Sequence, residues 1–249
     1  MAEPSKCTLN NILQSILAVA NQSANAFYPP SIFQSQFNTV TSLLISALVK
    51  SYPDNPEVID MLSPFIRVAK IPVTDGYVQL PEEYRNILGT PMINVRADKS
   101  GLCGGDSDIP VTANTFKTAN MKAGCKRRPV VIVPQAEFAD QTTSTYREPT
   151  YWDPIGYMNG KKQLFVCPYD IAKVDVMYCV QEKSYVFPYI TQPDDTYIFD
   201  ANSSSLVESE WTSAAFTHIF NAMTALYSAY SHDPNMRDWS MILKKEGIL

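Results

Sequence analysis

Few residues of this chain have the types and spacing that catalysis requires. The 249 residues include only two histidines, His218 and His232, so a serine or cysteine nucleophile has few candidate bases. His218 falls in a helical pattern beside Ile219 and Phe220, which predicts a packed or interface histidine rather than a base. His232 ends that pattern, where a capping role is the default. With no GxSxG, Walker or GxGxxG motif, the sequence predicts no catalytic residue and no enzyme.

Metal and cofactor chemistry have equally little support. The five cysteines are Cys7, Cys103, Cys125, Cys167 and Cys179. No CxxC spacing occurs among them, so we predict buried or free thiols in a reducing compartment and no zinc site. The stretch "GLCGGDSD" at 101–108 lacks the regular oxygen ligands and final Glu of a calcium loop. Glu82 and Glu83 are adjacent, so they point apart and cannot form the facing pair of a glycosidase. We predict no metal and no cofactor.

Apolar residues at helical spacing predict helices at both ends of the chain. The stripe of the first helix, about residues 8–26, consists of Leu9, Ile12, Leu13, Ile16, Leu17 and Ala20, with Thr8 as its cap. A second helix starts at Ser31 and ends near "SYPDNP", and a short one covers about 56–66. Towards the C-terminus, Ser205 and Glu208 fit a capping box before a stripe from Phe216 to Tyr230. A last short helix is predicted on "RDWSMILKKEG".

The middle of the chain has the alternation and turn residues of β-structure. Asp75-Gly76 separates "RVAKIPV" from "YVQLP", which predicts a hairpin with Tyr77 and Leu80 facing the core. Pro81 is expected to end that strand and start a helical turn, with Glu82 and Glu83 at its positive end. Further predicted strands are "PMINVRA", "RPVVIVP", "QLFVCP", "KVDVMYCV" and "TYIFD".

The order of these elements indicates an α+β fold, with N-terminal and C-terminal helices packed with a central, mostly antiparallel β region. We divide the chain into an N-terminal helical part (1–70), a β-rich part (71–200) and a C-terminal helical part (201–249). These parts are expected to form one composite domain. The segments 98–127 and 139–160 are rich in Gly, Asp, Asn and Thr and are predicted to be long loops.

Charged residues are missing from both predicted long helices. Residues 7–49 contain none, and residues 211–231 contain only His218. The helix sides away from the apolar stripes carry Asn, Gln, Ser and Thr, which cost less to desolvate than a charge. Such helices suit burial on two sides, one within the chain and one against another subunit, because interface cores lose charges. The alternative is that these are ordinary helices of chance composition.

The remaining charge pattern excludes some partners. With 20 Lys and Arg against 25 Asp and Glu, the net charge of −5 argues against a dedicated nucleic-acid binder. A basic cluster nevertheless stands at Lys117, Lys122, Lys126, Arg127 and Arg128. It fits a solvated loop, or contact with an acidic partner or passing DNA. No apolar stretch is expected to approach the roughly 20 residues of a membrane span, so we predict a soluble, unexported chain without a membrane partner.

Three segments together resemble one protein family. They are "VTDGYVQLPEEYRNILG" (73–89), "RPVVIVPQAEFADQTTSTYREPTYWDPIGYMNGKKQLFVCP" (128–168) and "YDIAKVDVMYCVQEKSYVFPYI" (169–190). The chain resembles head-to-tail connector ring (adaptor) proteins of tailed bacteriophages, of the crAss-like phage type. The matching positions are Gly76, Tyr77, Leu80, Pro81 and Tyr84, then Glu137, Phe138, Pro149 and Pro154, then Val166, Pro168, Ile171, Val174 and Tyr178. Residues 98–127 have no counterpart in the pattern.

The resemblance implies a virion structural protein, assembled in the host cytoplasm. Its copies would form a homo-oligomeric ring, twelvefold by analogy, bound to the portal protein and to other connector or tail proteins. Transient, non-specific DNA would pass through the lumen. A second interpretation is a carbohydrate-binding or adhesion β module, for which Trp152, Trp211 and Trp239 give some support, although the last two fall on predicted helices. An enzyme of unknown type is the third.

Overall fold

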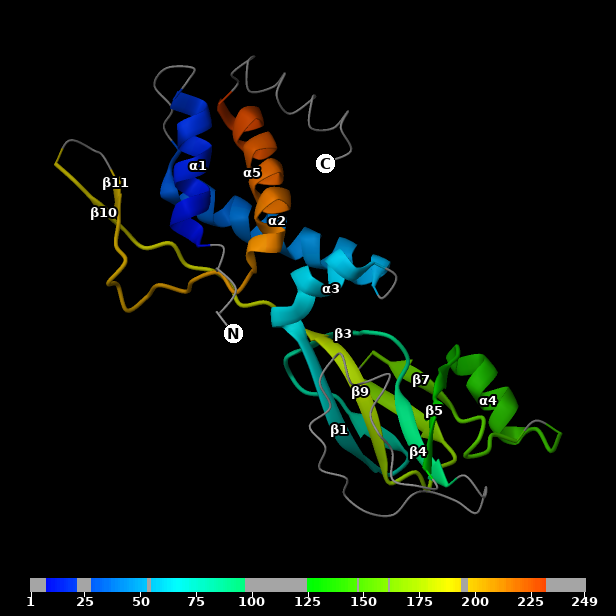
Figure 1. Cartoon of the computed structure of the whole chain (residues 1–249). Coiled ribbons are helices and arrows are strands. Elements are labelled where there is room, and N and C mark those ends of the chain that lie inside the picture. The colour runs from blue at the N-terminus through cyan, green and yellow to red at the C-terminus, as the bar shows by residue number, and fades with distance from the viewer. Residues whose placement is uncertain are drawn as a thin grey trace. The chain divides into compact units, whose positions relative to one another are not determined.

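The computed structural model describes residues 8–21, 28–52, 55–96, 125–146, 148–160, 162–193 and 197–231. The fold is α+β, as the sequence predicts, and its sheet is mostly antiparallel (Figure 1). The chain divides into two compact units. A helical unit consists of residues 1–64 and 182–249, and a β unit consists of residues 65–181. The β unit is therefore an insertion between two segments that fold together.

The helical unit contains α1 (Leu9–Asn21), α2 (Pro30–Ser51), α3 (Pro56–Leu62) and α5 (Phe216–Ser231). The short 3-10 helix η2 (Ser213–Ala215) precedes α5, and η1 (Ser63–Phe65) follows α3 where the units join. α5 packs against both α1 and α2 (Figure 1). The core of the helical unit contains Phe33 and Phe37 from α2, Trp211, and Ile219 and Met223 from α5, and all five side chains are fully buried.

A two-stranded hairpin, β10 (Tyr189–Thr191) and β11 (Tyr197–Phe199), also belongs to this unit. Figure 1 shows it extending away from the helices of its unit, in yellow. Both strands lie between the extended segment around Tyr185 and the non-helical segment that leads to η2.

The β unit is one sheet with strand order β5-β4-β9-β1-β2-β8-β7-β6, and β3 pairs with β9. Its strands are β1 (Ile66–Thr74), β2 (Tyr77–Gln79), β3 (Tyr84–Ile87), β4 (Met92–Arg96), β5 (Cys125–Pro129), β6 (Val131–Ile132), β7 (Ile155–Asn159), β8 (Gln163–Cys167) and β9 (Lys173–Val180). β5 and β6 form opposite edges, yet only Val130 separates them. Because one stretch of chain joins both edges, the sheet is nearly closed. Helix α4 (Gln135–Thr143) packs against β7.

The Asp75-Gly76 hairpin is confirmed. Both residues have positive φ, 53° and 78°, which a two-residue turn of this kind requires. A Cβ on Gly76 would also lie 2.7 Å from Cδ1 of Tyr169, so a side chain here would force the Tyr169 ring to move. Val78 and Leu80 face the core as buried residues, whereas Tyr77 lies half-buried on the other face of the strand against Phe165. The expectation that Tyr77 faces the core is therefore wrong.

Several local predictions need correction. The turn predicted to start at Pro81 is a single hydrogen-bonded turn, in which the Tyr84 N–H donates to the Pro81 carbonyl oxygen at 3.0 Å, and the chain then enters strand β3 and not a helix. The predicted loop 98–127 ends in β5, and the predicted loop 139–160 contains the end of α4 and all of β7. Residues 205–208 do not start a helix, because α5 begins at Phe216. Trp211 likewise precedes the helix instead of lying on it. The predicted final helix, His232 and Trp239 lie outside the described residues, as do 101–108.

Candidate functional site

Helix α2 has an apolar core face and an exposed face whose one charge is Lys50, in the last turn. The exposed residues of that face before Lys50 are Ser31, Ser35, Thr39, Leu43, Ser46 and Ala47, here called the outer face of α2. Leu43 is 65% exposed. The hydroxyl of Thr39 donates to the Ser35 carbonyl oxygen at 2.9 Å, and that of Ser46 to the Ser42 carbonyl oxygen at 3.0 Å. Because these hydroxyl protons are bonded within the helix, another protein surface can cover the face at low desolvation cost.

Part of the uncharged composition of α2 is explained by contacts inside the chain. The side-chain amide of Asn38 accepts from the Tyr185 backbone N–H at 2.8 Å and donates to the Tyr185 carbonyl oxygen at 3.0 Å. The Gln34 side chain accepts from the backbone N–H of Phe187 at 3.0 Å. An amide both donates and accepts, so it can pair with extended backbone where a charged side chain could not. These polar residues therefore face the chain's own segment, not a second subunit.

α2 also meets a length and composition criterion that the sequence interpretation overlooked. The helix has 22 residues and an 18-residue window with a mean hydropathy of 1.2, so by length and composition alone it could cross a membrane. The expectation that no stretch approaches such a length is therefore wrong. The helix nevertheless has protein partners within its unit. Phe33 packs edge-on against Phe187, and Phe37 against Tyr185, with ring centroids 5.2 and 5.3 Å apart.

The other two helices that lack Lys, Arg, Asp and Glu, α1 and α5, differ in how much of their surface is exposed. On α1, Asn11, Gln14 and Ala18 are exposed while Leu9 and Ile12 are buried. The backbone N–H of Leu9 donates to Oε1 of Glu208 at 2.7 Å, so a carboxylate from a distant segment lies at the positive end of α1. Glu208 of the predicted capping box therefore bonds to α1 and not to a helix that directly follows it.

Helix α5 is buried over much more of its surface, including the polar residues Asn221, Thr224 and Ser228. Its lack of charge therefore follows from packing inside the unit. His218 is exposed, so the prediction of a packed histidine is wrong, and an interface role for it stays a prediction.

The basic cluster is mostly engaged within the β unit. Lys126, Arg127 and Arg128 lie on strand β5, and Lys117 and Lys122 lie outside the described residues. Arg127, whose side chain is 12% exposed, forms an ion pair with the buried Asp175 of β9 at 2.5 Å. The Arg128 guanidinium lies 3.9 Å from the Trp152 ring centroid, and the Lys126 ammonium lies 5.6 Å from it. A solvated loop is therefore the wrong description of residues 126–128.

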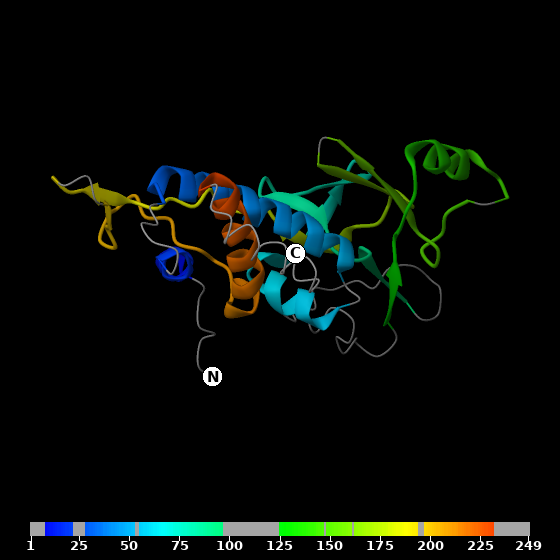
Figure 2. The ribbon, with the colours of Figure 1, turned by 90° about the horizontal axis from the view of Figure 1, so that it is seen from above.

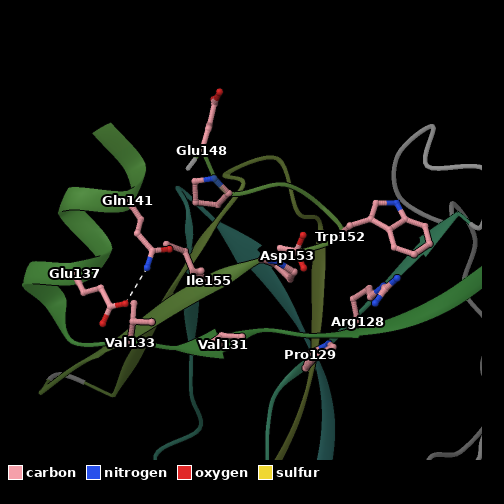
Figure 3. Close-up of a pocket in the computed structure, with 12 residues that line it drawn as sticks. Arg128, Pro129, Val131, Val133, Glu137, Gln141, Glu148, Trp152, Asp153 and Ile155 are labelled. Carbon is pink, nitrogen blue, oxygen red and sulfur yellow. Dashed lines mark hydrogen bonds between the residues drawn. The ribbon is translucent and has the colours of Figure 1, made fainter. Parts of the chain in front are cut away.

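A hollow of about 450 Å³ opens beside this Trp152 stack. Figure 3 shows Arg128 and Trp152 at one side and Glu137 and Gln141 of α4, which are hydrogen-bonded at 2.9 Å, at the other. Its described lining contains no serine, cysteine or histidine, so it offers no nucleophile and base. Nor do the described residues of the chain bring three potential metal ligands together.

The remaining candidates for chemistry have structural partners. Glu83 accepts a hydrogen bond from the Tyr178 hydroxyl at 3.2 Å, and the Glu82 carbonyl oxygen accepts one from Lys162 at 2.6 Å. Cys167 and Cys179 are buried free thiols, as predicted for them. Burial, with a smaller contribution from Glu148, raises the pKa of the Cys167 thiol, which disfavours the reactive thiolate.

Two tryptophans bear on the carbohydrate-binding alternative. Trp211 is fully buried, and the Trp152 ring already stacks with Arg128, so neither presents a free aromatic platform. Neither a protein-family model nor a curated protein matches this sequence. The resemblance to connector ring proteins therefore stays a prediction, and the surfaces themselves must support any function.

Proposed function

We propose that this chain is a virion structural protein of a tailed bacteriophage, repeated as a ring in the connector between portal and tail. The ring would bind the portal protein and neighbouring connector or tail proteins and leave a channel for DNA. Twelvefold symmetry follows from analogy with connector rings bound to portals. The chain would be assembled into virions in the host cytoplasm.

The outer face of α2 carries this proposal. It is exposed over more than four helical turns of a 22-residue helix, yet it holds no charge from Ser31 to Ala47. A helix that faces water normally has charged residues on its outer side. The Thr39 hydroxyl bonds within the helix, and Leu43 is exposed, so this face suits contact with another protein. Its lack of charge agrees with this, since interface cores are depleted of charged residues.

The charge of the chain agrees with a DNA channel that does not hold its cargo. Each phosphate contact made by a Lys or Arg strengthens binding to DNA. A ring of subunits with net charge −5 would let DNA pass without tight binding. The engaged side chains of Arg127 and Arg128 leave fewer free cations in the described part of the chain.

The test compares two lysine substitutions in a portal-binding assay. Thr39→Lys places a charge on the outer face of α2. Thr143→Lys is the matched control, because Thr143 is also exposed and its hydroxyl also bonds to its own helix, α4. The purified wild-type and variant proteins would be mixed with portal rings of the same virus, and the mass of the complexes measured.

We expect the wild type and Thr143→Lys to form a ring on the portal, and Thr39→Lys to bind at least about tenfold more weakly, or 1.4 kcal/mol. Both variants should unfold within about 0.5 kcal/mol of wild type, since both sites are exposed. A wild-type protein that stays a monomer, ignores the portal and binds glycans would contradict the proposal and favour the carbohydrate-binding alternative.

A further inference from the structure

The hollow beside Trp152 contains a guanidinium group whose hydrogen-bond donors are not used within the described residues. Arg128 lies with its guanidinium 3.9 Å from the centroid of the Trp152 ring. This stack uses the flat face of the group and leaves its N–H donors, which lie in the plane, free for hydrogen bonds. No described residue accepts a hydrogen bond from Arg128, and its Nε is buried. Buried donors in proteins nearly always have an acceptor, so an acceptor on a bound molecule would complete this group.

The opposite side of the hollow is acidic. Helix α4, the green helix in Figure 2, packs against β7 and carries Glu137 and Gln141 in the wall across from Trp152 (Figure 3). Glu137 accepts a hydrogen bond from the neutral amide of Gln141 at 2.9 Å, and no described cation pairs with it. A carboxylate has about four lone-pair sites, so Glu137 can accept from a further donor. Glu148 and Asp153 add two carboxylates to the lining, and neither forms an ion pair with a described residue.

The two sides of the hollow therefore differ in charge, and apolar residues lie between them. Lys126, 5.6 Å from the Trp152 ring centroid, adds a second positive charge on the side of Arg128. Val131 and Val133 contribute apolar surface to the lining (Figure 3). The volume of about 450 Å³ lies within the range of small-molecule sites, about 300–1,000 Å³. A molecule that matches this arrangement has a carboxylate at one end, a cationic group at the other and an aliphatic chain between them.

We propose that this hollow binds such a dipolar ligand by both of its ends. Arg128 binds the carboxylate of the ligand through charge-assisted hydrogen bonds, and Glu137 binds its ammonium group. Val131 and Val133 contact the aliphatic chain. A lysine at the carboxyl end of a polypeptide has this chemistry, and so has a free ω-amino acid. A ligand with a single charge satisfies only one side of the hollow and is therefore bound more weakly. The site lies in the β unit and does not depend on the proposed ring.

Titration of the full-length protein with ε-aminocaproate tests the inference. This molecule has as many carbon atoms between its carboxylate and its ammonium group as a carboxyl-terminal lysine has. Caproate and hexylamine are the matched probes, because each lacks one of the two charges. In NMR spectra of the isotope-labelled protein we expect saturable shifts of the Trp152 indole N–H and the Arg128 Nε–H, and at least about tenfold weaker binding of either single-charge probe. No saturable shift at these two groups, or equal affinity for caproate or hexylamine, would overturn the inference.

Two substitutions separate the two ends of the site. Arg128→Gln should remove the preference for ε-aminocaproate over hexylamine, and Glu137→Gln should remove the preference over caproate. Lys126→Gln and Asp140→Asn are the matched controls, because they remove the same charges from β5 and α4 at residues that do not line the hollow, and both should keep the two preferences. Circular dichroism would verify folding, and Glu137→Gln tests the site at an exposed residue even if Arg128→Gln unfolds. Equal losses in a control and its matched variant would overturn the inference.

A tripeptide distinguishes the two sources of this chemistry. Gly-Gly-Lys with a free carboxyl end presents a carboxyl-terminal lysine, and the same peptide with a carboxyl amide is the control that lacks the carboxylate. Tighter binding of Gly-Gly-Lys than of ε-aminocaproate would support the dipolar site and identify the ligand as the end of a polypeptide. Weaker binding would support the site and identify a free ω-amino acid. An amide that binds as tightly as the free acid would overturn the role of Arg128.

Discussion

In the β unit a buried carboxylate, Asp175, pairs with Arg127, whereas in the helical unit the amides of Gln34 and Asn38 pair with extended backbone. Of the chain's 20 lysines and arginines, 14 lie in residues 65–181 and 6 in the two segments of the helical unit, whereas the 25 Asp and Glu divide almost evenly, 12 and 13. An amide costs less free energy to desolvate than an ion does. The helical unit can therefore present uncharged faces to other proteins. In the proposed ring we therefore expect the helical unit to make the subunit contacts.

The largest expected effect comes from breaking the ion pair of the β unit. Asp175→Ala leaves the guanidinium of Arg127 buried without its carboxylate, which should cost about 3–5 kcal/mol. Hydrogen exchange should show lost protection in β9 and its neighbours β1 and β4, with that of α2 unchanged. Replacing both residues, as Arg127→Met with Asp175→Leu, should restore most of the stability. A single variant as stable as wild type would show that the pair is not structural.

The corresponding change in the helical unit should have a smaller effect. Asn38→Ala leaves both the N–H and the carbonyl of Tyr185 without their partner, which should cost about 2–3 kcal/mol. Urea unfolding measures the loss, and hydrogen exchange should place it in α2 and not in β9. The neighbouring Thr39→Ala is the control, because its hydroxyl bonds only to its own helix, and should stay within about 0.5 kcal/mol. Equal effects for the two variants would contradict the role of the amide.

Local patterns predicted much of both units. Helices α1 and α2 and the Asp75-Gly76 turn depend on residues close in sequence, and the structure confirms these elements. Helix α4 was missed because Phe138 is its only buried residue, so it has no apolar stripe. The near-closure of the sheet depends on pairing between strands far apart in sequence, such as β1 with β9, which no local pattern reveals.

The candidate surfaces were predictable only in part. The absence of charge in residues 7–49 is visible in the sequence, but it cannot separate Asn38, which bonds to Tyr185, from Thr39, which is exposed. Both are neutral and polar, and only the position of the segment at 185–187 distinguishes them. The hollow beside Trp152 was equally hidden, since "RPVVIVP" predicts a strand and not the segments that lie beside it. Glu208 could be recognised as a cap from the sequence, but the helix it caps lies about 200 residues away.

The stability of the protein at alkaline pH offers a third test of the difference between the helical unit and the β unit. In the helical unit, burial and then Glu182 and Glu210 raise the pKa of Tyr185 far above its usual value. In the β unit, burial and Glu83 raise that of Tyr178, but Arg67 opposes them. A raised pKa means that the tyrosine stays protonated to a higher pH in the folded state than in the unfolded state. The free energy of unfolding is therefore unaffected by the tyrosine below about pH 10 and decreases above it.

Above about pH 10, the free energy of unfolding should fall by an amount that approaches about 1.4 kcal/mol per pH unit because of Tyr185. The decrease due to Tyr178 should be smaller. Unfolding in urea between pH 9 and 11 would measure it, with Tyr185→Phe and Tyr178→Phe as the variants that remove each contribution. If removing Tyr178 flattens the pH dependence more than removing Tyr185, the two units do not differ in the way proposed.

The smallest expected effect concerns Glu208, the carboxylate that lies at the N-terminal end of α1. Glu208→Gln keeps the shape of the side chain but removes its charge from the N-terminus of α1, which should cost about 0.5–1 kcal/mol. Hydrogen exchange should show the first turn of α1 opening more often, and added salt should reduce the difference from wild type. Glu210→Gln is the control, since Glu210 pairs with Lys183, whose side chain is 70% exposed, and should change stability less. A larger effect at Glu210 than at Glu208 would mean that the helical unit relies on surface ion pairs after all, as the β unit relies on its buried one.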